Sequence, residues 1–338
     1  MESKFTRRRL ITAGAGAAAL GILPRVSAIN SAKAADTRVR MTTGVRAASQ
    51  SIAWIGAEAG MFRKHGLEVG FPKIEVGGIE AAIGLVRGDW DFSHTGTTPI
   101  VEEVLKGNYQ VILMRNTAPH AGIFVMSRRE ITTLGQLQGK KVGVLTDAQS
   151  GQTGIITRLT LEKAGVAASY LGLGTYQNIY KALGAGEIDA GALPIDLRFS
   201  GQRQYGWNAF QTSAFGVPSI FATTRKLIAS DRNLVMNVVR GMVETIHLFK
   251  TRPDVVVPLL QRFLDLSDRK AAEDLHDFYA PLFPAVPLPS LSDGMQDLRD
   301  LFAKRYPAAQ KLEESDIADS SFVNELDKSG YIQKLYAS

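Results

Sequence analysis

Between about residue 37 and residue 225, short apolar runs alternate with segments whose apolar side chains repeat at helical spacing. Val39 and Met41 alternate with polar residues, as in a strand with one buried face, whereas Ile52, Ile55 and Gly56 share one face of a helix. The alternation continues along the chain and predicts βαβ units, in which helices cover a largely parallel sheet. The next expected strands are 67–71, 91–94, 109–114, 141–145 and 188–192, and the expected helices between them are 79–87, 99–106, 152–164 and 179–185.

A glycine ends each of these expected helices, and one such ending occurs twice. Residues 85–91 have the pattern Leu-x-x-Gly-x-x-Asp, and residues 183–189 repeat it at the same place in a second βαβ cycle. Glycine tolerates the left-handed conformation that stops a helix. The repeat therefore predicts two similarly wound lobes.

The last third of the chain is predicted to be almost wholly helical. Helical spacing extends over 227–250, 253–264, 268–279 and 293–306, interrupted by the proline-rich stretch 281–289. Helices with this spacing bury one face, and we expect them to cover a sheet.

The first 35 residues have the features of a secretory signal. Three arginines at 7–9 precede an apolar run at 11–23 and a small-residue site at 32–34. The stretch 6–11 resembles the twin-arginine export signal, with Leu10 where that signal usually has Phe. The apolar run is shorter than the roughly 20 residues that cross a bilayer. We expect cleavage near residue 34 or 35 and a periplasmic mature protein; an uncleaved amphipathic helix is the alternative.

Charge and composition exclude several classes of function. The 338 residues carry a net charge of +6, but residues 1–35 alone contribute +5, which leaves 33 basic and 32 acidic residues in the rest. A basic surface for nucleic acid is therefore not expected. Because the chain has no cysteine, disulfides, zinc–thiolate sites, iron–sulfur clusters, a cysteine nucleophile and a lipoprotein anchor are excluded. The length favours two domains.

Motifs for cofactors and catalysis are weak. The sequence Gly-Leu-Gly at 172–174 lacks the third glycine of a dinucleotide site, and no P-loop occurs. Ser150 lacks the nucleophile elbow, the histidines at 65, 94, 120, 247 and 276 lack metal-ligand spacing, and the pair Glu102-Glu103 is expected on a solvated helix face. We expect neither a cofactor nor a metal.

Four motifs resemble one protein family. They are AEAGMFRKHGLEV at 57–69, LVRGDWDFSHTGTTP at 85–99, LxxLxGKKVGV at 134–144 and LEKAG at 161–165. In this order they resemble the substrate-binding components of ABC importers, in the branch for nitrate, sulfonates, taurine and the thiamine pyrimidine precursor. They span most of residues 38–225, whereas the helical last third matches in character only.

The resemblance implies an α/β type II periplasmic-binding fold. Two lobes would each have a central, mostly parallel sheet, a cleft would lie between them, and the C-terminal region would be helical. Crossovers near 121–127 and 218–224 would divide the chain into lobe one, 36–124 plus 222–338, and lobe two, 125–221. The resemblance further implies a monomeric receptor that binds a small molecule and is recognised by an ABC permease with its cytoplasmic ATPase, so that contact with the membrane complex is peripheral only.

Candidate ligand-binding residues follow from the rule that open α/β sheets bind ligands beyond the carboxyl ends of their strands, near helix N-termini. Four polar loops satisfy it: 46–51, 94–98, 147–153 and 174–178. With neighbouring positions, the candidates are Arg46, Ser49, Gln50, Trp54, His94, Thr95, Gly96, Thr97, His120, Asp147, Ser150, Thr175 and Asp196.

Several candidates have a purely structural alternative. Ser51 and Thr98 are equally suited to cap helices, and Arg46 to be a solvated loop charge. Trp54 is either a core residue or an apolar wall of the cleft, and the wall is favoured. For His94 a hydrogen-bonded structural role is favoured over ligand contact, because the residue follows a buried strand.

The ligand is expected to be a small organic anion or zwitterion of the sulfonate, taurine, nitrate or carboxylate class. Arg46 could pair with an anion, so Arg46→Ala should weaken binding. If Asp147 and Asp196 both face the cleft, an amine or zwitterion becomes more plausible.

An enzyme on the same fold is the second interpretation. Desulfinases and a thiamine-precursor synthase resemble this family, but the first needs a cysteine nucleophile and the second a cysteine cluster, and neither exists here. A sensor domain is the third, although no membrane anchor or signalling module follows in the sequence.

Overall fold

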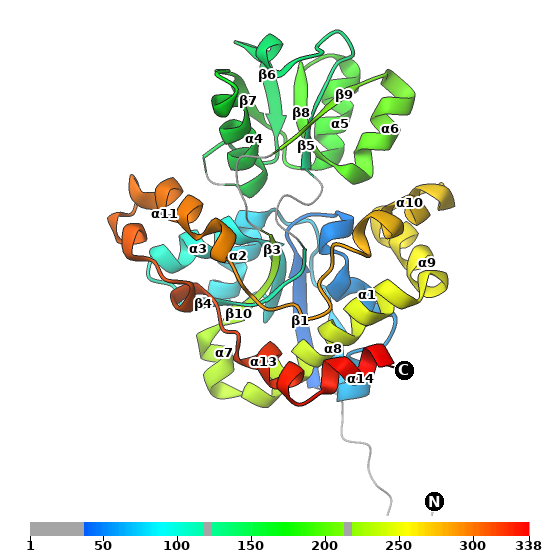
Figure 1. The fold of residues 1–338 in the computed structure, drawn as a ribbon, viewed down its shortest axis with the longest axis vertical. Coiled ribbons are helices and arrows are strands. Elements are labelled where there is room, and N and C mark those ends of the chain that lie inside the picture. Colours follow the sequence, from blue (N-terminus) through cyan, green and yellow to red (C-terminus); the bar gives the residue numbers. More distant parts are fainter. Residues whose placement is uncertain (1–36, 118–122, 150, 213–217, 338) are drawn as a thin grey trace, which may run out of the picture. The chain divides into compact units, whose positions relative to one another are not determined.

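Two five-stranded sheets form the centre of the computed structural model, which describes residues 37–117, 123–149, 151–212 and 218–337 (Figure 1). All of these residues belong to one compact unit. The first sheet has the order β2-β1-β3-β10-β4, with β1 Thr37–Thr43, β2 Leu67–Gly70, β3 Phe92–Gly96, β4 Gln110–Arg115 and β10 Ser219–Thr224. The second has the order β7-β6-β8-β5-β9, with β5 Ile123–Ser127, β6 Lys141–Val144, β7 Ser169–Gly172, β8 Ala190–Pro194 and β9 Asn208–Gln211.

Each sheet mixes parallel and antiparallel pairs. β1 is parallel to β2 and β3, and β6 is parallel to β7 and β8, as βαβ units require. β10 is antiparallel to both of its neighbours, and so is β5. β5 is the first strand after the chain leaves the first sheet, and β10 is the first strand after it returns from the second. Neither strand is therefore linked to its sheet neighbours by a βαβ unit. The α/β class is confirmed, with sheets more mixed than expected.

The two sheets repeat one pattern of connections. Asp91, at the start of β3, donates its N–H to the Arg40 carbonyl and accepts the Arg40 N–H on Oδ2, both at 2.8 Å. Asp189, just before β8, does the same with Lys141, at 2.9 and 3.0 Å. The preceding helices end at Gly88 and its counterpart in 183–189, with φ of 77° and 76°. The expected repeat is confirmed.

Helices flank both sheets. Around the first sheet are α1 Ile52–Glu58, α2 Gly78–Arg87 and α3 Thr97–Leu105, and around the second are α4 Gln152–Lys163, α5 Tyr176–Ala185 and α6 Ile195–Tyr205. In Figure 1, α2 and α3 lie on one side of the first sheet and α1 on the other. Right-handed crossovers explain this, because the chain steps from β1 to β2 in one direction and on to β3 in the other.

The remaining helices form the helical last third that the sequence predicted. They are α7 Arg225–Ser230, α8 Arg232–Thr251, α9 Pro253–Leu264, α10 Arg269–Tyr279, α11 Met295–Ala303, α12 Glu314–Ile317, α13 Ser321–Lys328 and α14 Tyr331–Ala337. Of these, α7, α12 and α13 contact strands of the first sheet. Short 3₁₀ turns are η1 Ala48–Gln50, η2 Arg63–His65, η3 Leu134–Leu137, η4 Ser292–Gly294 and η5 Pro307–Lys311. The long helix α8 packs against α1, α9, α13 and α14.

The first sheet is buried on both faces. Its central strands carry Phe92 and Phe221, which are fully buried and stack with ring centroids 5.5 Å apart. Strands before and after the expected crossovers fall in different sheets; the residues at which one lobe gives way to the other stay a prediction. The expected signal segment lies outside the described residues.

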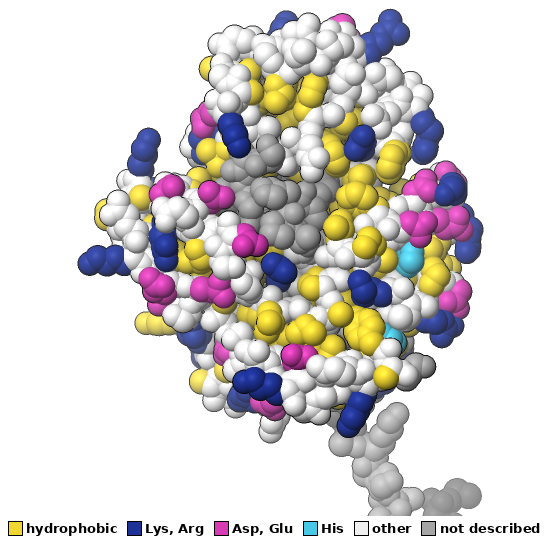
Figure 2. All heavy atoms as spheres, in the orientation of Figure 1, with side chains coloured by type: hydrophobic (Ala, Val, Ile, Leu, Met, Phe, Trp, Pro, Cys, Tyr) yellow, Lys and Arg dark blue, Asp and Glu magenta, His cyan; other side chains and the backbone are white. Residues whose placement is uncertain are grey.

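Two surface properties bear on partners. Within the described part of the chain, no helix combines the length and the apolar character needed to cross a membrane. On the face drawn in Figure 2, acidic and basic side chains are interspersed over the helices rather than gathered by sign.

Candidate ligand-binding site

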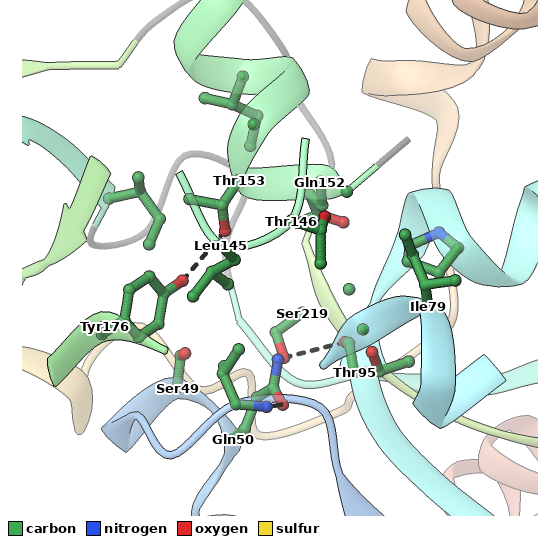
Figure 3. A pocket seen from close by; sticks show the side chains of 18 of the residues that line it. Ser49, Gln50, Ile79, Thr95, Leu145, Thr146, Gln152, Thr153, Tyr176 and Ser219 are labelled. Atoms are coloured by element: carbon green, nitrogen blue, oxygen red, sulfur yellow. Dashed lines mark hydrogen bonds between the residues drawn. The ribbon is translucent and has the colours of Figure 1, made fainter. Parts of the chain in front are cut away.

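A cavity of about 80 Å³ is lined by residues that follow strands of both sheets (Figure 3). One water needs roughly 10 to 15 Å³ on the same measure, so the space equals that of about five to eight waters. The polar lining residues are Ser49, Gln50, Thr95, Thr117, Thr146, Gln152, Thr153, Tyr176, Thr212 and Ser219. The others are Val45, Gly78, Ile79, Gly96, Pro99, Ile123, Leu145, Gly151, Gly154 and Ile156.

Four helices begin at this cavity. Gly78 and Ile79 open α2, Gly96 precedes α3, Gln152 opens α4 and Tyr176 opens α5. The first N–H groups of a helix have no acceptor within the helix, and the helix dipole gives this end a partial positive charge. The cavity therefore has a favourable potential for anions that comes from backbone alone.

The described part of the cavity wall carries no charged side chain. None of the described residues that line it is Asp, Glu, Lys, Arg or His. Arg46 lies outside the lining, where its Nη1 donates to the Phe263 carbonyl at 3.0 Å and its Nε lies 3.4 Å from Glu75 Oε2. Burial raises the pKa of Glu75, and Arg46 opposes that rise. Arg46 and Glu75 thus neutralise each other beside the site.

Hydroxyl groups make up most of the polar side chains that line the cavity. Thr153 Oγ1 and Tyr176 Oη lie 3.0 Å apart, and Ser219 Oγ donates to the Thr95 carbonyl at 3.3 Å (Figure 3). Burial raises the pKa of Tyr176, so its phenol keeps its proton. Gln50 Oε1 accepts the Val45 N–H at 3.0 Å, which fixes the side chain and orients its amide group.

Thr95 Oγ1 is a buried polar atom at the cavity without a hydrogen-bond partner among the described residues. Thr95 is fully buried at the end of β3, and its Oγ1 has no hydrogen-bond partner in the described structure. A buried hydroxyl without a partner costs stability, so such groups call for a partner. A ligand oxygen in the cavity would supply it.

Two side chains join the two halves of the structure beside the cavity. Gln152 Oε1 accepts the N–H of Thr97 at 2.5 Å and that of Thr98 at 3.3 Å, and so caps α3 from the other half. Gly96 makes the approach possible, because a Cβ there would lie 2.5 Å from that oxygen. Asp196 Oδ2 accepts the Ala48 N–H at 2.7 Å.

Asp196 is an acid in an unfavourable environment. Its Oδ1 is buried without a hydrogen-bond partner among the described residues. Burial raises the pKa of Asp196 to about 6, and the N–H groups of Ala48 and of Asp196 itself oppose the rise. The carboxylate is therefore held by one contact across the cleft.

Four of the sequence-predicted residues line the cavity: Ser49, Gln50, Thr95 and Gly96. Their role in binding stays a prediction. His120 and Ser150 lie outside the described residues.

The other candidates lie outside the lining. Trp54 packs on Phe263, with ring centroids 5.4 Å apart, as a core residue does. His94 is buried, with Nε2 2.7 Å from Asn116 Nδ2. Burial lowers the pKa of His94 to about 3, against an opposing effect of the Ser49 backbone, so the ring stays neutral.

Three further candidates have local hydrogen bonds. Thr97 Oγ1 donates to the Pro218 carbonyl at 2.8 Å, and Asp147 Oδ1 accepts the Gln149 N–H at 2.6 Å. Thr175 caps α5 by accepting an N–H at 3.1 Å. Asp147 and Asp196 are both absent from the described lining, so neither offers a carboxylate to an amine there.

One of the two expected caps is in place and the other is wrong. Ser51 occupies the N-cap position of α1, but its Oγ donates to the Ala48 carbonyl at 2.8 Å instead of accepting a helix N–H. α3 begins at Thr97 rather than after Thr98, and Gln152 accepts the N–H groups that a cap would have accepted.

The sequence reasoning missed several lining residues. Gln152 and Tyr176 lie within the predicted polar loops, but their long side chains gave no signal of their own. Thr146 follows β6, and Ser219 opens β10 in the predicted crossover. The signal that could have found them is position at a strand end. Among the described residues no group of three or more His, Asp or Glu could hold a metal ion.

Comparison with known proteins places this geometry in context. Residues 79–200 match the family model described as ABC transporter, phosphonate, periplasmic substrate-binding protein. A comparison with curated protein sequences finds no match. The match over 79–200 confirms the resemblance to substrate-binding components of ABC importers.

Solved structures share the fold at low sequence identity. The periplasmic aliphatic sulphonate-binding protein SsuA of Escherichia coli is 16% identical, with a TM-score of 0.64 over 82% of this chain and 91% of that one. The alkanesulfonate-binding protein SsuA of Xanthomonas axonopodis pv. citri, bound to MOPS, is 14% identical, with a TM-score of 0.65 over 86% and 97%. The periplasmic nitrate-binding protein NrtA of Synechocystis PCC 6803 is 11% identical, with a TM-score of 0.69 over 87% and 89%. The chain has the periplasmic-binding-protein fold.

Proposed function

We propose that this protein is an extracytoplasmic solute-binding protein that delivers a small organic anion to an ABC importer. The observation that carries the proposal is a hydroxyl-lined cavity at which four helices begin and whose described lining has no charged side chain. The ligand classes under consideration are sulfonates, taurine, nitrate and carboxylates, to which the matched family model adds phosphonates.

The strength of such a site can be worked out from its parts. Each helix N-terminus contributes roughly 0.3 to 1 kcal/mol to anion binding, and up to about 2 where partly buried. Each hydrogen bond to a charged oxygen adds roughly 1.5 to 3 kcal/mol. A micromolar complex requires about 8 kcal/mol, a value that lies within the range that two helix ends and three or four hydrogen bonds can reach.

The protein would release its ligand unaltered. The matched family model and the sulfonate- and nitrate-binding neighbours are described as binding proteins, not enzymes. The desulfinase and synthase alternatives also lack their cysteines. The contacts of Gln152 and Asp196 would hold the two halves together around the ligand for recognition by the permease and its ATPase. A twin-arginine-type signal would place the monomer in the periplasm.

A ligand screen tests the proposal. The mature protein should gain thermal stability with at least one compound among alkylsulfonates, nitrate, small carboxylates and alkylphosphonates, and the compound should be recovered unchanged. Turnover of one of them with no thermal shift for any would favour an enzyme.

Thr95→Val sharpens the test because it removes an unpartnered hydroxyl and keeps the side-chain shape. The free protein should lose no stability, whereas affinity for an anion should fall about tenfold to a hundredfold, the effect of one charge-assisted hydrogen bond. Ser93→Ala is the matched control: Ser93 Oγ is also buried and unpartnered on β3, but Ser93 does not line the cavity. A loss of affinity in the control alone, or in neither variant, would contradict the assigned site.

A further inference from the structure

We propose that the cavity selects compact ligands with a single negative charge, and that it discriminates against both dianions and ligands with an ionised amine. The inference rests on the proposed function and adds the charge state of the ligand.

Charged groups near the cavity are bound to other parts of the protein. Arg46 is held by Glu75 and by the Phe263 carbonyl, and Asp196 Oδ2 by the Ala48 N–H. The described lining contains neither a cation that could neutralise a second negative charge nor a carboxylate that could pair with an ammonium group. The charge of the ligand must therefore be balanced by the helix N-termini and hydroxyl groups of the described lining alone.

Fixed dipoles favour one negative charge over two. The attraction between an anion and the N-termini of α2 and α4 grows in proportion to the charge. The cost of removing the anion from water grows with the square of the charge in the Born description. Going from a monoanion to a dianion thus doubles the gain and roughly quadruples the cost. Because the described lining holds no counter-charge, the dianion is disfavoured.

An ionised amine is disfavoured for the opposite reason. The positive ends of the helix dipoles repel it, and every helix start at the cavity presents the same sign. Neutral hydroxyl oxygens are the acceptors that the described lining offers an ammonium group, and it contains no carboxylate. Ile79, Leu145 and Ile156 line the same cavity and are apolar. They suit a short alkyl group instead, which agrees with a volume of about 80 Å³.

The affinity for a phosphonate should depend on pH, because its charge changes between one and two. A phosphoryl group loses its second proton near neutral pH. Its monoanion keeps one P–OH donor, which the hydroxyl oxygens of Thr146 or Thr95 can accept. Only this form suits a described lining without charged side chains, so the measured affinity should follow the monoanion fraction.

Three ligands of one shape test the inference: ethanesulfonate, ethylphosphonate and 2-aminoethanesulfonate, titrated calorimetrically into the mature protein between pH 7 and 9. We expect a pH-independent affinity for ethanesulfonate. The affinity for ethylphosphonate should fall about tenfold per pH unit above its second pKa, and 2-aminoethanesulfonate should bind at least about tenfold more weakly than ethanesulfonate.

The outcomes separate the inference from the proposed function. Phosphonate affinity that rises with pH, or tighter binding of 2-aminoethanesulfonate than of ethanesulfonate, overturns the inference and leaves a solute-binding protein. Absence of binding by all three and by every compound of the wider screen overturns the proposed function itself.

Discussion

Asp196→Asn tests whether the structure holds an ionised carboxylate at a cost. Asp196 lies in the first turn of α6, with Oδ2 bound to the Ala48 N–H and Oδ1 buried without a described partner. Burial raises the pKa of Asp196 from 3.8 to about 6. Asparagine keeps an acceptor for the Ala48 N–H and removes the charge.

The size of the effect follows from that pKa. One pKa unit corresponds to about 1.36 kcal/mol, so the ionised form costs the folded state about 3 kcal/mol. Between pH 4 and pH 6 the folded protein binds more protons than the unfolded chain, and the Asp196 contribution to the free energy of unfolding falls as pH rises. Above pH 6 the full cost is present, and below pH 4 it is absent.

Denaturant unfolding at a series of pH values measures this directly. Asp196→Asn should be more stable than the wild type by up to about 3 kcal/mol at pH 7.5, and the difference should vanish near pH 4. Asp231→Asn is the control, because Asp231 also accepts a backbone N–H, at 2.9 Å, but at an exposed position; its effect should stay within about 0.5 kcal/mol. A variant that is less stable at pH 7.5, or a difference that does not change with pH, would refute the reasoning.

Three further changes have defined outcomes. Gln152→Ala removes the side chain that caps α3 from the opposite half, so affinity for an anion should fall about twofold to twelvefold, the effect of one neutral hydrogen bond. In the same titration, the control Gln149→Ala, at an exposed position, should leave the affinity unchanged. Arg46→Ala should change affinity less than about twofold because Glu75 and a backbone carbonyl already engage the guanidinium; a tenfold loss would make Arg46 a ligand counter-ion, as the sequence suggested. In the wild type, the buried His94 ring resists the proton that the unfolded chain takes up below pH 6.5, so acidification to pH 4 should lower the free energy of unfolding by roughly 3 kcal/mol. His94→Gln has no such group and should lose less stability over the same range. Equal losses of stability in the wild type and the variant would contradict this.

Local sequence signals predicted the framework of the fold well. Strand and helix periodicity located the βαβ units, and the repeated Leu-x-x-Gly-x-x-Asp pattern identified two equivalent helix endings. These features depend on neighbouring residues, so the chain encodes them locally. The order of strands in the sheets was less accessible, because β5 and β10 enter each sheet from the other half of the chain.

The site was predicted less completely because its chemistry depends on distant contacts. Arg46 looked like a free charge, but its partner carbonyl is 217 residues away in the sequence. Gln152 reaches α3 across 55 residues. Trp54 was favoured as a cavity wall, yet it packs on Phe263. The rule about strand ends correctly located the site beyond the carboxyl ends of the strands. Which side chains face the cavity depends on tertiary packing, which the sequence pattern does not show.

A crystal structure of the mature protein with ethanesulfonate would show whether backbone and hydroxyl groups, rather than a cation, hold the anion. We expect sulfonate oxygens within hydrogen-bond distance of Thr95 Oγ1 and of the first N–H groups of α2, with no Lys or Arg side chain in contact. A ligand held by Arg46 or another cation, or bound away from this cavity, would overturn this expectation.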